Sequence, residues 1–365
     1  MALFQKKNMK KKVITFVINS LEVGGTEKQL LQLIKEIKEK YKVKLLCFKK
    51  GKLHKYFLKE KVEVFSLSKG LFSFIFLIKF LIKNKTDIYH FFLPKSYILC
   101  SLILIFSKVK KIMSRRSLNN YHKKYWYLSL LLEKLLHKKT DLILVNSKEI
   151  KKQLVETEKV NQKKILTIEN FNLSQISSPK SYNKIPKKRK NEVFFIYVAN
   201  FIPYKGHLDL LKICSEIVTQ RKWKLFLVGE DRENYKEELV KYISISKIKN
   251  NIIFFEPTLG IHNFYKAVDF AVSTSKEEGS SNFLLESISF GLPIISYDVG
   301  GNKKFHNGKN GFLIKCGDDF KFKAKIQKLI DLNNRKDFEK NSFLIFRKRK
   351  KNRELFKIYE KLYDL

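Results

Sequence analysis

Residues 275–301 read SKEEGSSNFLLESISFGLPIISYDVGG, and this stretch decides the fold class of the chain. The small residues 279–282 predict a loop that opens a helix, and Gly291 and Pro293 predict where that helix ends. The apolar run IISYDV that follows is typical of a buried strand. A small-residue turn, a helix N-terminus and a following strand are the layout of an anion site in an open α/β sheet.

Two carboxylates flank this helix N-terminus. Glu278 precedes the predicted helix, and Glu286 lies eight positions later, inside it. Both can therefore face a ligand whose phosphates rest on the helix N-terminus. A charged first turn and a solvated helix face would explain the same residues without a ligand, but Glu286 has apolar neighbours on both sides in LLESIS, which disfavours simple solvent exposure. The pattern indicates a nucleotide sugar or a similar phosphorylated, hydroxyl-rich ligand.

Short apolar runs alternate with helical patterns on both sides of this stretch. The predicted strands are VITFVIN, VKLLCF, VEVFSL, DIYHFFL, KIMSRR and DLILVNS in the first half, and EVFFIYVAN, KWKLFLVGE, NIIFF, DFAVST, PIISYDV and GFLIKC in the second. Such alternation predicts parallel sheets with crossover helices. Between the two series, the polar, basic and proline-containing segment SQISSPKSYNKIPKKRKN predicts a linker.

The fold class is therefore α/β, with two doubly wound, Rossmann-like domains that face a cleft. We expect an N-terminal domain over residues 1–173, a linker over 174–190 and a C-terminal domain over 191–336. Residues 337–365 predict a basic C-terminal helix that can pack back on the N-terminal domain. A length of 365 residues fits two domains of ordinary size.

The charge balance limits the possible partners. The chain has 75 Lys and Arg against 35 Asp and Glu, a formal net charge of +40. This excess favours nucleic acid, anionic lipid or phosphorylated ligands, although the abundance of Lys, Ile, Phe and Asn also fits an AT-rich coding sequence. Because the basic residues are spread along the chain and no base-reading motif occurs, specific nucleic-acid binding is the weaker hypothesis. An anionic membrane surface is an expected partner.

No segment reaches the roughly 18 uncharged apolar residues that span a bilayer. The run LFSFIFLIKFLI, from Leu71, contains Lys79, and YILCSLILIFS, from Tyr97, is too short. Both are therefore expected to be helices buried on one face, with contact with a membrane surface as the weaker alternative. The cysteines have no metal-like spacing and are expected to be buried free thiols in a reducing cytoplasm. They are Cys47, Cys100, Cys214 and Cys316.

Two further turns follow predicted strands. Gly24 and Gly25 come directly after the first strand, and backbone N–H groups at such a turn can approach a phosphate closely because glycine has no Cβ. A tight strand-to-helix turn without a ligand is the plainer interpretation. Lys205 likewise lies between a strand and a helix, where it can neutralise a leaving diphosphate, although any lysine of so basic a chain is a surface residue by default.

Together, and in this order, the Gly24–Gly25 turn, the turn from Asn200 to Lys205, the pair Glu278 and Glu286 and the DVGG turn closely resemble the retaining glycosyltransferases of family 4, which have the GT-B fold and an E-x7-E signature. The resemblance covers residues 13 to about 318. It implies transfer of a sugar from a UDP- or GDP-type donor to a surface glycan that is lipid-linked, without a metal ion or other cofactor. With its basic surface, such an enzyme would be a peripheral protein on the cytoplasmic face of a bacterial inner membrane.

The resemblance also assigns roles to residues. Lys205 would stabilise the diphosphate leaving group and Glu278 would contact the donor sugar, which makes these two the catalytic candidates. Glu286 would bind the ribose hydroxyls, and Gly24 and Gly25 would complete the phosphate cradle from the opposite domain. The expected donor-binding set is Gly24, Gly25, Asn200, Lys205, Glu278, Gly279, Ser280, Ser281, Asn282, Phe283, Leu284 and Glu286.

The chain departs from the family pattern at two places. Many relatives have arginine at the position of Asn200, so a second cation must come from elsewhere, and Arg115 and Arg116 are candidates although adjacent arginines are more often surface residues. Relatives often have two histidines in the strand around His90, and here Phe92 takes the second place. A proton or acceptor role for His90 and a purely structural one are both left open. A nucleotide-sugar 2-epimerase of the same architecture and a non-catalytic relative are the nearer alternatives.

Overall fold

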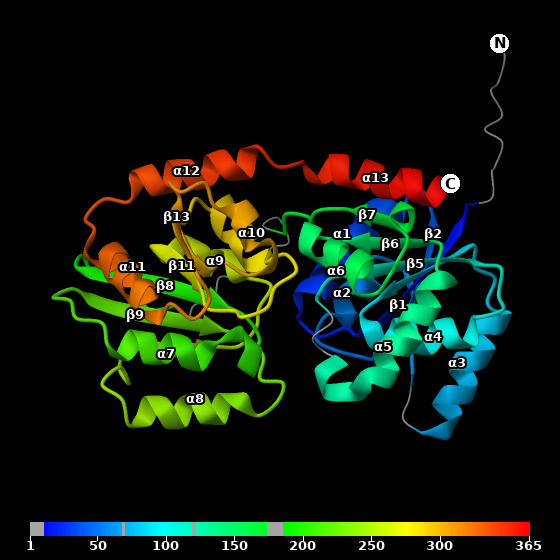
Figure 1. Ribbon diagram of the computed structural model, residues 1–365, viewed down its shortest axis with the longest axis horizontal. Helices are drawn as coiled ribbons and strands as arrows, with labels where there is room; N and C mark the ends of the chain where they lie inside the picture. Colours follow the sequence, from blue (N-terminus) through cyan, green and yellow to red (C-terminus); the bar gives the residue numbers. More distant parts are fainter. Residues whose placement is uncertain (1–10, 68–69, 119–121, 174–184) are drawn as a thin grey trace, which may run out of the picture.

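The computed structural model describes residues 11–67, 70–118, 122–173 and 185–365, which form two α/β domains (Figure 1). The domains lie side by side, and the C-terminal tail runs along one edge of both. Residues 174–184 of the predicted linker lie outside the described residues.

The N-terminal domain is built on a parallel seven-stranded sheet with the order β3-β2-β1-β4-β5-β6-β7. The central strands are apolar runs buried on both faces, as parallel strands between two helical layers must be. The three-residue strand β7 is too short to stand out in the sequence. The strands are β1 (Val13–Ser20), β2 (Lys42–Lys49), β3 (Glu63–Ser66), β4 (Ile88–Phe92), β5 (Lys110–Arg115), β6 (Leu142–Val145) and β7 (Ile165–Thr167).

Crossover helices connect these strands and cover both faces of the sheet (Figure 1). Most of them bury one apolar stripe, as the 3.6-residue periodicity of their sequences predicts. The helices are α1 (Gly25–Ile37), α2 (His54–Lys59), α3 (Leu71–Lys83), α4 (Pro94–Ile103), α5 (His122–Lys138) and α6 (Lys148–Glu156), with a 3₁₀ turn, η2 (Gln162–Lys164).

The C-terminal domain repeats the plan with a parallel six-stranded sheet in the order β10-β9-β8-β11-β12-β13. Its strands are β8 (Glu192–Val198), β9 (Lys222–Val228), β10 (Ile252–Phe255), β11 (Phe270–Ser273), β12 (Ile294–Tyr297) and β13 (Gly311–Ile314). Its helices are η3 (Pro203–Lys205), α7 (His207–Ser215), α8 (Tyr235–Ser244), α9 (Ile261–Ala267), α10 (Asn282–Ser289), η4 (Gly300–Phe305) and α11 (Asp319–Asp331).

Each sheet reverses its strand order once, between β1 and β4 in the first domain and between β8 and β11 in the second. Open α/β sheets bind ligands outside the carboxyl ends of the strands at such a reversal, because the flanking loops part there. The loops that leave β1, β8 and β11 carry the residues singled out in the sequence. The chain order therefore places them at the two switch points.

The C-terminal tail consists of two helices where the sequence predicts one. The first, α12 (Lys336–Arg347), stays on the C-terminal domain, where the Ser342 hydroxyl donates to the carbonyl of Leu292 at 2.8 Å. The second, α13 (Asn352–Asp364), lies on the N-terminal domain (Figure 1). Its apolar stripe completes the core of that domain. The buried members of the stripe are Leu355, Phe356, Tyr359 and Tyr363.

The four cysteines and the apolar helices α3 and α4 differ in part from what the sequence predicts. Cys47, Cys100 and Cys214 are buried free thiols, but Cys316 is exposed because it lies in the turn directly after β13. The helices α3 and α4 each bury one face, and the outer face of α3 is nevertheless apolar. Among the described residues, no helix has both the length and the hydropathy to cross a bilayer.

Candidate active site

A cavity of about 720 Å³ lies between the two domains, at the carboxyl ends of both sheets. The loops after β1, β4 and β5 form one wall, and the loops after β8, β9 and β11 form the other. The cleft that the domain repeat predicts is therefore present, and the two switch points face each other across it.

The turn after β8 brings Lys205 into this cavity. Gly206, which follows Lys205, has φ +69°, and a Cβ at this position would lie 2.2 Å from the carbonyl oxygen of Thr274. Only glycine therefore lets the loop after β8 touch the loop after β11. Across this contact, Lys205 Nζ donates to Glu278 Oε1 at 2.7 Å. The two catalytic candidates thus form an ion pair at the cavity wall.

The Lys205–Glu278 pair is largely shielded from solvent, with side-chain exposures of 16% and 14%. Burial acts to lower the pKa of Lys205, but the charge and hydrogen bond of Glu278, together with Tyr204 and Tyr197, outweigh burial and raise that pKa above its ordinary value. Lys205 therefore stays positively charged at the point where the sequence places a leaving diphosphate. Glu278 fixes the direction of the ammonium group.

The helix α10 presents its N-terminus to the cavity. Ser281 caps it, since the Ser281 hydroxyl accepts from the backbone N–H of Leu284 at 3.2 Å. Residues 279–283 line the cavity, and the first N–H groups of a helix have no partner within the helix, so they can receive an anion. Leu284 departs from its predicted donor-binding place: its side chain lies in the core, its amide is bonded to Ser281, and it does not line the cavity.

Glu286 lies one turn further along α10 and is buried at the cavity wall. The hydroxyl of Tyr265 donates to Glu286 Oε2 at 2.8 Å and fixes the carboxylate. Burial raises the pKa of Glu286, while the positive charge of Lys28 and the Tyr265 hydrogen bond act in the opposite direction. A buried carboxylate held on one oxygen is suited to accept hydrogen bonds from ligand hydroxyls.

The N-terminus of α1 meets the N-terminus of α10 across the cavity. A Cβ at Gly25 would lie 2.5 Å from Nδ2 of Asn282, and a Cβ at Gly24 would lie 2.1 Å from Oε2 of Glu27. Both glycines line the cavity. The close approach of the two helices depends on the missing side chain of Gly25, whereas Gly24 leaves room for the carboxylate of Glu27 in the same helix. Two helix N-termini therefore face the same space, where their dipoles favour negative charge.

Asn282 joins the two domains. Its Oδ1 atom accepts from Asn170 Nδ2 at 2.6 Å and from Gln29 Nε2 at 3.1 Å, and both donors belong to the N-terminal domain. The Asn170 amide also donates to the carbonyl of Ser280 at 3.1 Å. The side-chain oxygen of Asn282 is thus used at the domain interface.

Asn200 carries no charge, and cations from other loops line the cavity. Asn200 lines the cavity and accepts a long hydrogen bond of 3.5 Å from the amide of Glu230, so it braces the loop after β9. Arg232 of that loop also lines the cavity, and its Nε atom donates to Glu230 Oε2 at 2.9 Å. From the N-terminal domain, Arg116 and Lys28 line the cavity, with Arg116 Nη1 donating to Asn170 Oδ1 at 2.7 Å. The candidate Arg116 is therefore brought to the site.

Arg115 points away from the cavity. Its guanidinium is fully buried and pairs with Glu133 at 2.6 Å and with Glu158 at 3.1 Å. The neighbouring arginines therefore differ in function, because successive residues of a strand point to opposite faces of the sheet. Arg115 is neither a surface residue nor a ligand contact.

His90 is also outside the cavity. Its Nδ1 atom is hydrogen-bonded to the hydroxyl of Tyr363 at 2.8 Å, and its Nε2 atom to the hydroxyl of Ser114 at 2.8 Å. Burial, followed by the charge of Arg116, holds the pKa of His90 well below its ordinary value. His90 is a neutral, structural residue that ties β4 to α13, and the proton or acceptor role considered for it has no geometric basis.

The sequence patterns did not single out five charged residues that line the cavity: Glu27, Lys28, Arg232, Glu233 and Glu277. Lys28 and Glu27 lie in the first turn of the helix that follows the glycine pair, and Arg232 lies in the loop after a strand adjacent to β8. Each of these residues follows a strand that lies at or beside a switch point, and this position in the sequence is the feature that could have identified it. Burial raises the pKa of Glu27 to about 7. Within the described ranges, no group of His, Cys, Asp and Glu side chains is arranged to hold a metal ion.

Two Rossmann-like α/β domains with a carboxylate-lined cleft between them define a GT-B architecture. The family description "Glycosyl transferases group 1" matches residues 180–344, and "Glycosyltransferase Family 4" matches residues 23–171. The two matches together span most of the chain. The chain belongs to the family 4 glycosyltransferases, as the motif order predicts.

Known relatives and solved structures agree with this assignment. An uncharacterized glycosyltransferase from Methanocaldococcus jannaschii is 28% identical over 239 residues, which are 63% of this chain and 60% of that protein. A Campylobacter jejuni protein named as an α-1,4-N-acetyl-D-galactosaminyltransferase of a diNAcBac-PP-undecaprenol-linked glycan is 24% identical over 348 residues, 90% of this chain and 92% of that protein. The chain spans between 42% and 60% of the length of the first three curated relatives it matches.

The fold is shared with Anabaena HepE, solved in complex with UDP and glucose. The two structures superpose with a TM-score of 0.84 at 18% sequence identity, over 97% of this chain and 100% of HepE. This likeness covers both domains.

Proposed function

We propose that this protein transfers a glycosyl group from a nucleoside diphosphate sugar to a lipid-linked glycan of the cell envelope, with retention of the anomeric configuration and without a metal ion. In the transfer, the bond between the anomeric carbon and the diphosphate oxygen breaks, and its electron pair leaves with the diphosphate. The acceptor oxygen bonds to the anomeric carbon on the same face, and its proton passes to the leaving diphosphate.

The observation that carries the proposal is the placement of Lys205, Glu278 and Glu286 on one wall of a cavity whose opposite wall carries Gly24 and Gly25. Breaking the donor bond builds negative charge on the diphosphate, and preorganised cations and N–H dipoles oppose that charge most effectively. Two helix N-termini face this space, and Lys205 is held charged within it. Lys28, Arg116 and Arg232 add charge that a metal ion would otherwise supply.

The two glutamates have different surroundings, which supports different roles. Glu278 is paired with Lys205 and lies near the site of charge development, so we assign it to the donor sugar. Glu286 is buried beside Tyr265, one turn into α10, so we assign it to the ribose hydroxyls. Of the two donor classes that the sequence leaves open, UDP sugars are favoured here, because HepE, which shares the fold, was solved with UDP.

The acceptor and the location are proposed from the relatives and from the charge. The Campylobacter relative is named for an undecaprenol-linked acceptor, which lies in a membrane. A net charge of +40 attracts a protein to anionic lipid. We therefore place the enzyme on the cytoplasmic face of the bacterial inner membrane.

The test is release of nucleoside diphosphate from a panel of UDP and GDP sugars, with and without an undecaprenyl-diphosphate-linked glycan. Glu286→Ala should raise the KM for the donor and lower turnover by about 10²-fold or more, because the ribose loses a buried partner. The matched control is Glu237→Ala on the exposed surface of α8, which should behave as the wild type. Unchanged turnover in Glu286→Ala would refute the site assignment.

The same assay separates the epimerase alternative, which the relatives do not favour. A 2-epimerase would invert the configuration at C2 of the donor sugar, which would remain attached to its nucleotide, and would form no new glycosidic bond to an acceptor. Analysis of the product by mass spectrometry distinguishes the two outcomes.

A further inference from the structure

The outer face of α3 is apolar where a soluble helix would be polar. Its inner face buries Leu77 and Leu81, whereas Phe72 and Ile82 on the outer face are 84% and 67% exposed. The polar side chains on this outer face are lysines, Lys79 and Lys83. Large exposed apolar areas are uncommon on soluble monomers and indicate an interaction surface.

This apolar surface continues over the neighbouring helices. Phe106, directly after α4, is 94% exposed, and Leu128, Leu131 and Leu135 form an exposed stripe at helical spacing on α5. The helix α4 packs against both α3 and α5, so the three helices form one layer on the N-terminal domain (Figure 1). We call this surface the N-terminal apolar patch and define it by Phe72, Ile82, Phe106, Leu128, Leu131 and Leu135.

The segment that carries the patch is almost free of acidic residues. Residues 71–139 contain 14 Lys and Arg against two acids, Asp87 and Glu133. Asp87 is tied to β1, where its carboxylate accepts from the amide of Val13 at 2.7 Å, and Glu133 is buried against Arg115. This stretch of the chain therefore carries a large excess of positive charge. Apolar side chains rimmed by lysines complement an anionic bilayer, in which acyl chains lie beneath negative headgroups.

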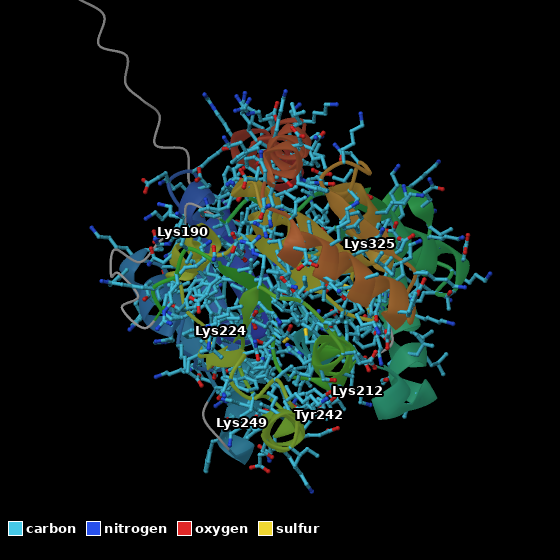
Figure 2. All side chains as sticks on the ribbon, turned by 90° about the vertical axis from the view of Figure 1, so that its left-hand side faces the viewer. Lys190, Lys212, Lys224, Tyr242, Lys249 and Lys325 are labelled. Carbon is cyan, nitrogen blue, oxygen red and sulfur yellow. The ribbon has the colours of Figure 1, made fainter. Side chains whose placement is uncertain are left out.

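Positive charge alone does not single out this face. Figure 2, which looks onto the C-terminal domain, labels Lys190, Lys212, Lys224, Lys249 and Lys325 on different sides of that domain. Lysines are thus also spread over the C-terminal domain. The N-terminal apolar patch differs because exposed aromatic and aliphatic side chains coincide there with a segment that has only two acidic residues.

The layer formed by α3, α4 and α5 also reaches the wall of the cavity. The helix α4 starts at Pro94, directly after Leu93 of the cavity wall, and the loop that precedes α5 contains Arg116, Ser117 and Leu118 of the same wall. A membrane in contact with these helices would lie beside the mouth of the cleft on the acceptor side. An acceptor anchored in that membrane could reach the donor without leaving its lipid.

We propose that the N-terminal apolar patch docks the protein on an anionic bilayer, with Phe72, Ile82 and Phe106 entering the interface and Lys79 and Lys83 contacting headgroups. This inference rests on the proposed function for its purpose, since a lipid-linked acceptor requires contact with a membrane. Its physical basis, exposed apolar area with excess positive charge, does not depend on the reaction.

The experiment is co-sedimentation with vesicles of 70% phosphatidylcholine and 30% phosphatidylglycerol, compared with phosphatidylcholine alone. The test variant Phe72→Ser/Ile82→Ser/Phe106→Ser should bind the anionic vesicles about 100-fold more weakly, because three inserted side chains are lost. The control variant Val218→Ser/Ile245→Ser/Phe320→Ser removes equally exposed apolar residues from the C-terminal domain and should bind as the wild type. Lys79→Glu/Lys83→Glu should weaken the preference for the anionic vesicles.

Equal binding by the test and control variants would overturn the proposal, as would binding of the wild type to neither vesicle. A concentration-dependent dimer that the test variant abolishes, without vesicle binding, would assign the patch to a second copy of the chain and also overturn it. The test variant should keep donor hydrolysis in solution, whereas Glu286→Ala should lose donor binding and keep vesicle binding. Failure of the docking surface and failure of the proposed function are therefore distinguishable.

Discussion

Replacing Lys205 with methionine should separate the catalytic from the structural contribution of the ion pair. The change removes the positive charge from the cavity and leaves the Glu278 carboxylate without the partner that lies 2.7 Å away. Methionine keeps the length and the apolar stem of the side chain. Both turnover and stability should fall, but for different reasons.

The two losses can be estimated from the geometry. An exposed ion pair contributes about 0–1 kcal/mol to stability, whereas breaking a fully buried pair costs about 3–5 kcal/mol. At exposures of 16% and 14% the pair is closer to the second case, and we expect a loss of about 2 kcal/mol in the free energy of unfolding. Removing one preorganised group that stabilises developing charge lowers kcat by about 10²- to 10³-fold.

The assay is a double-mutant cycle with Glu278→Gln, which measures kcat for nucleotide release and the free energy of unfolding in urea. The variant Lys205→Met/Glu278→Gln should recover about 1 kcal/mol of stability, because no unpaired charge is left. It should recover no activity. The control pair is Lys276 with Asp209, also 2.7 Å apart but more exposed, where Lys276→Met should change stability by less than about 1 kcal/mol.

A Lys205→Met variant that keeps kcat within about threefold of the wild type would refute the role of Lys205 in stabilising the leaving diphosphate, because removal of that cation should slow the reaction much more. Recovery of activity together with stability in the double variant would also refute this catalytic role. That result would mean that the pair only holds the loop in place.

Two further predictions concern the cavity loops. Gly206→Ala should lower the free energy of unfolding by about 3 kcal/mol or more, because a φ of +69° is strained for alanine and the new Cβ would lie 2.2 Å from the Thr274 carbonyl. The control is Gly308→Ala, where φ is +76° but the space is open, and it should lower the free energy of unfolding by only about 1 kcal/mol. Equal losses would contradict the steric argument. Since burial raises the pKa of Glu27 from 4.5 to about 7, the folded state binds a proton that the unfolded state releases, so stability should fall as the pH rises from about 4.5 to 7. The free energy of unfolding of Glu27→Gln, measured in urea titrations, should therefore rise relative to that of the wild type by up to about 3 kcal/mol between pH 5 and pH 8. A stability difference that does not depend on pH would exclude this cause.

Local patterns predicted the features that depend on adjacent residues. The helix start near Ser281, the burial of Glu286 and the strand-to-turn position of Lys205 follow from side-chain periodicity and glycine placement within a few residues. The two-domain α/β fold followed from the alternation of strands and helices, because parallel strands require crossover connections. These patterns can be recognised without knowledge of contacts between residues that are distant in the sequence.

Features that depend on residues distant in sequence could not be predicted in this way. His90 is structural because Tyr363, 273 positions later, hydrogen-bonds to it. Arg115 is buried because Glu133 and Glu158 approach it from two different segments. Arg232 reaches the cavity only because β9 lies beside β8 in the sheet. In each case the partner, rather than the residue, decides the role.

The packing of α13 has a consequence for biosynthesis. The core of the N-terminal domain contains Leu355, Phe356, Tyr359 and Tyr363, so this domain cannot be completed until residue 363 has been synthesised. Residue 173 is followed by about 190 residues, which a ribosome adds in roughly 10–40 s. During that time the domain lacks one side of its core, while the C-terminal domain can acquire all of its own strands. The domain that is made first is therefore the last to be finished.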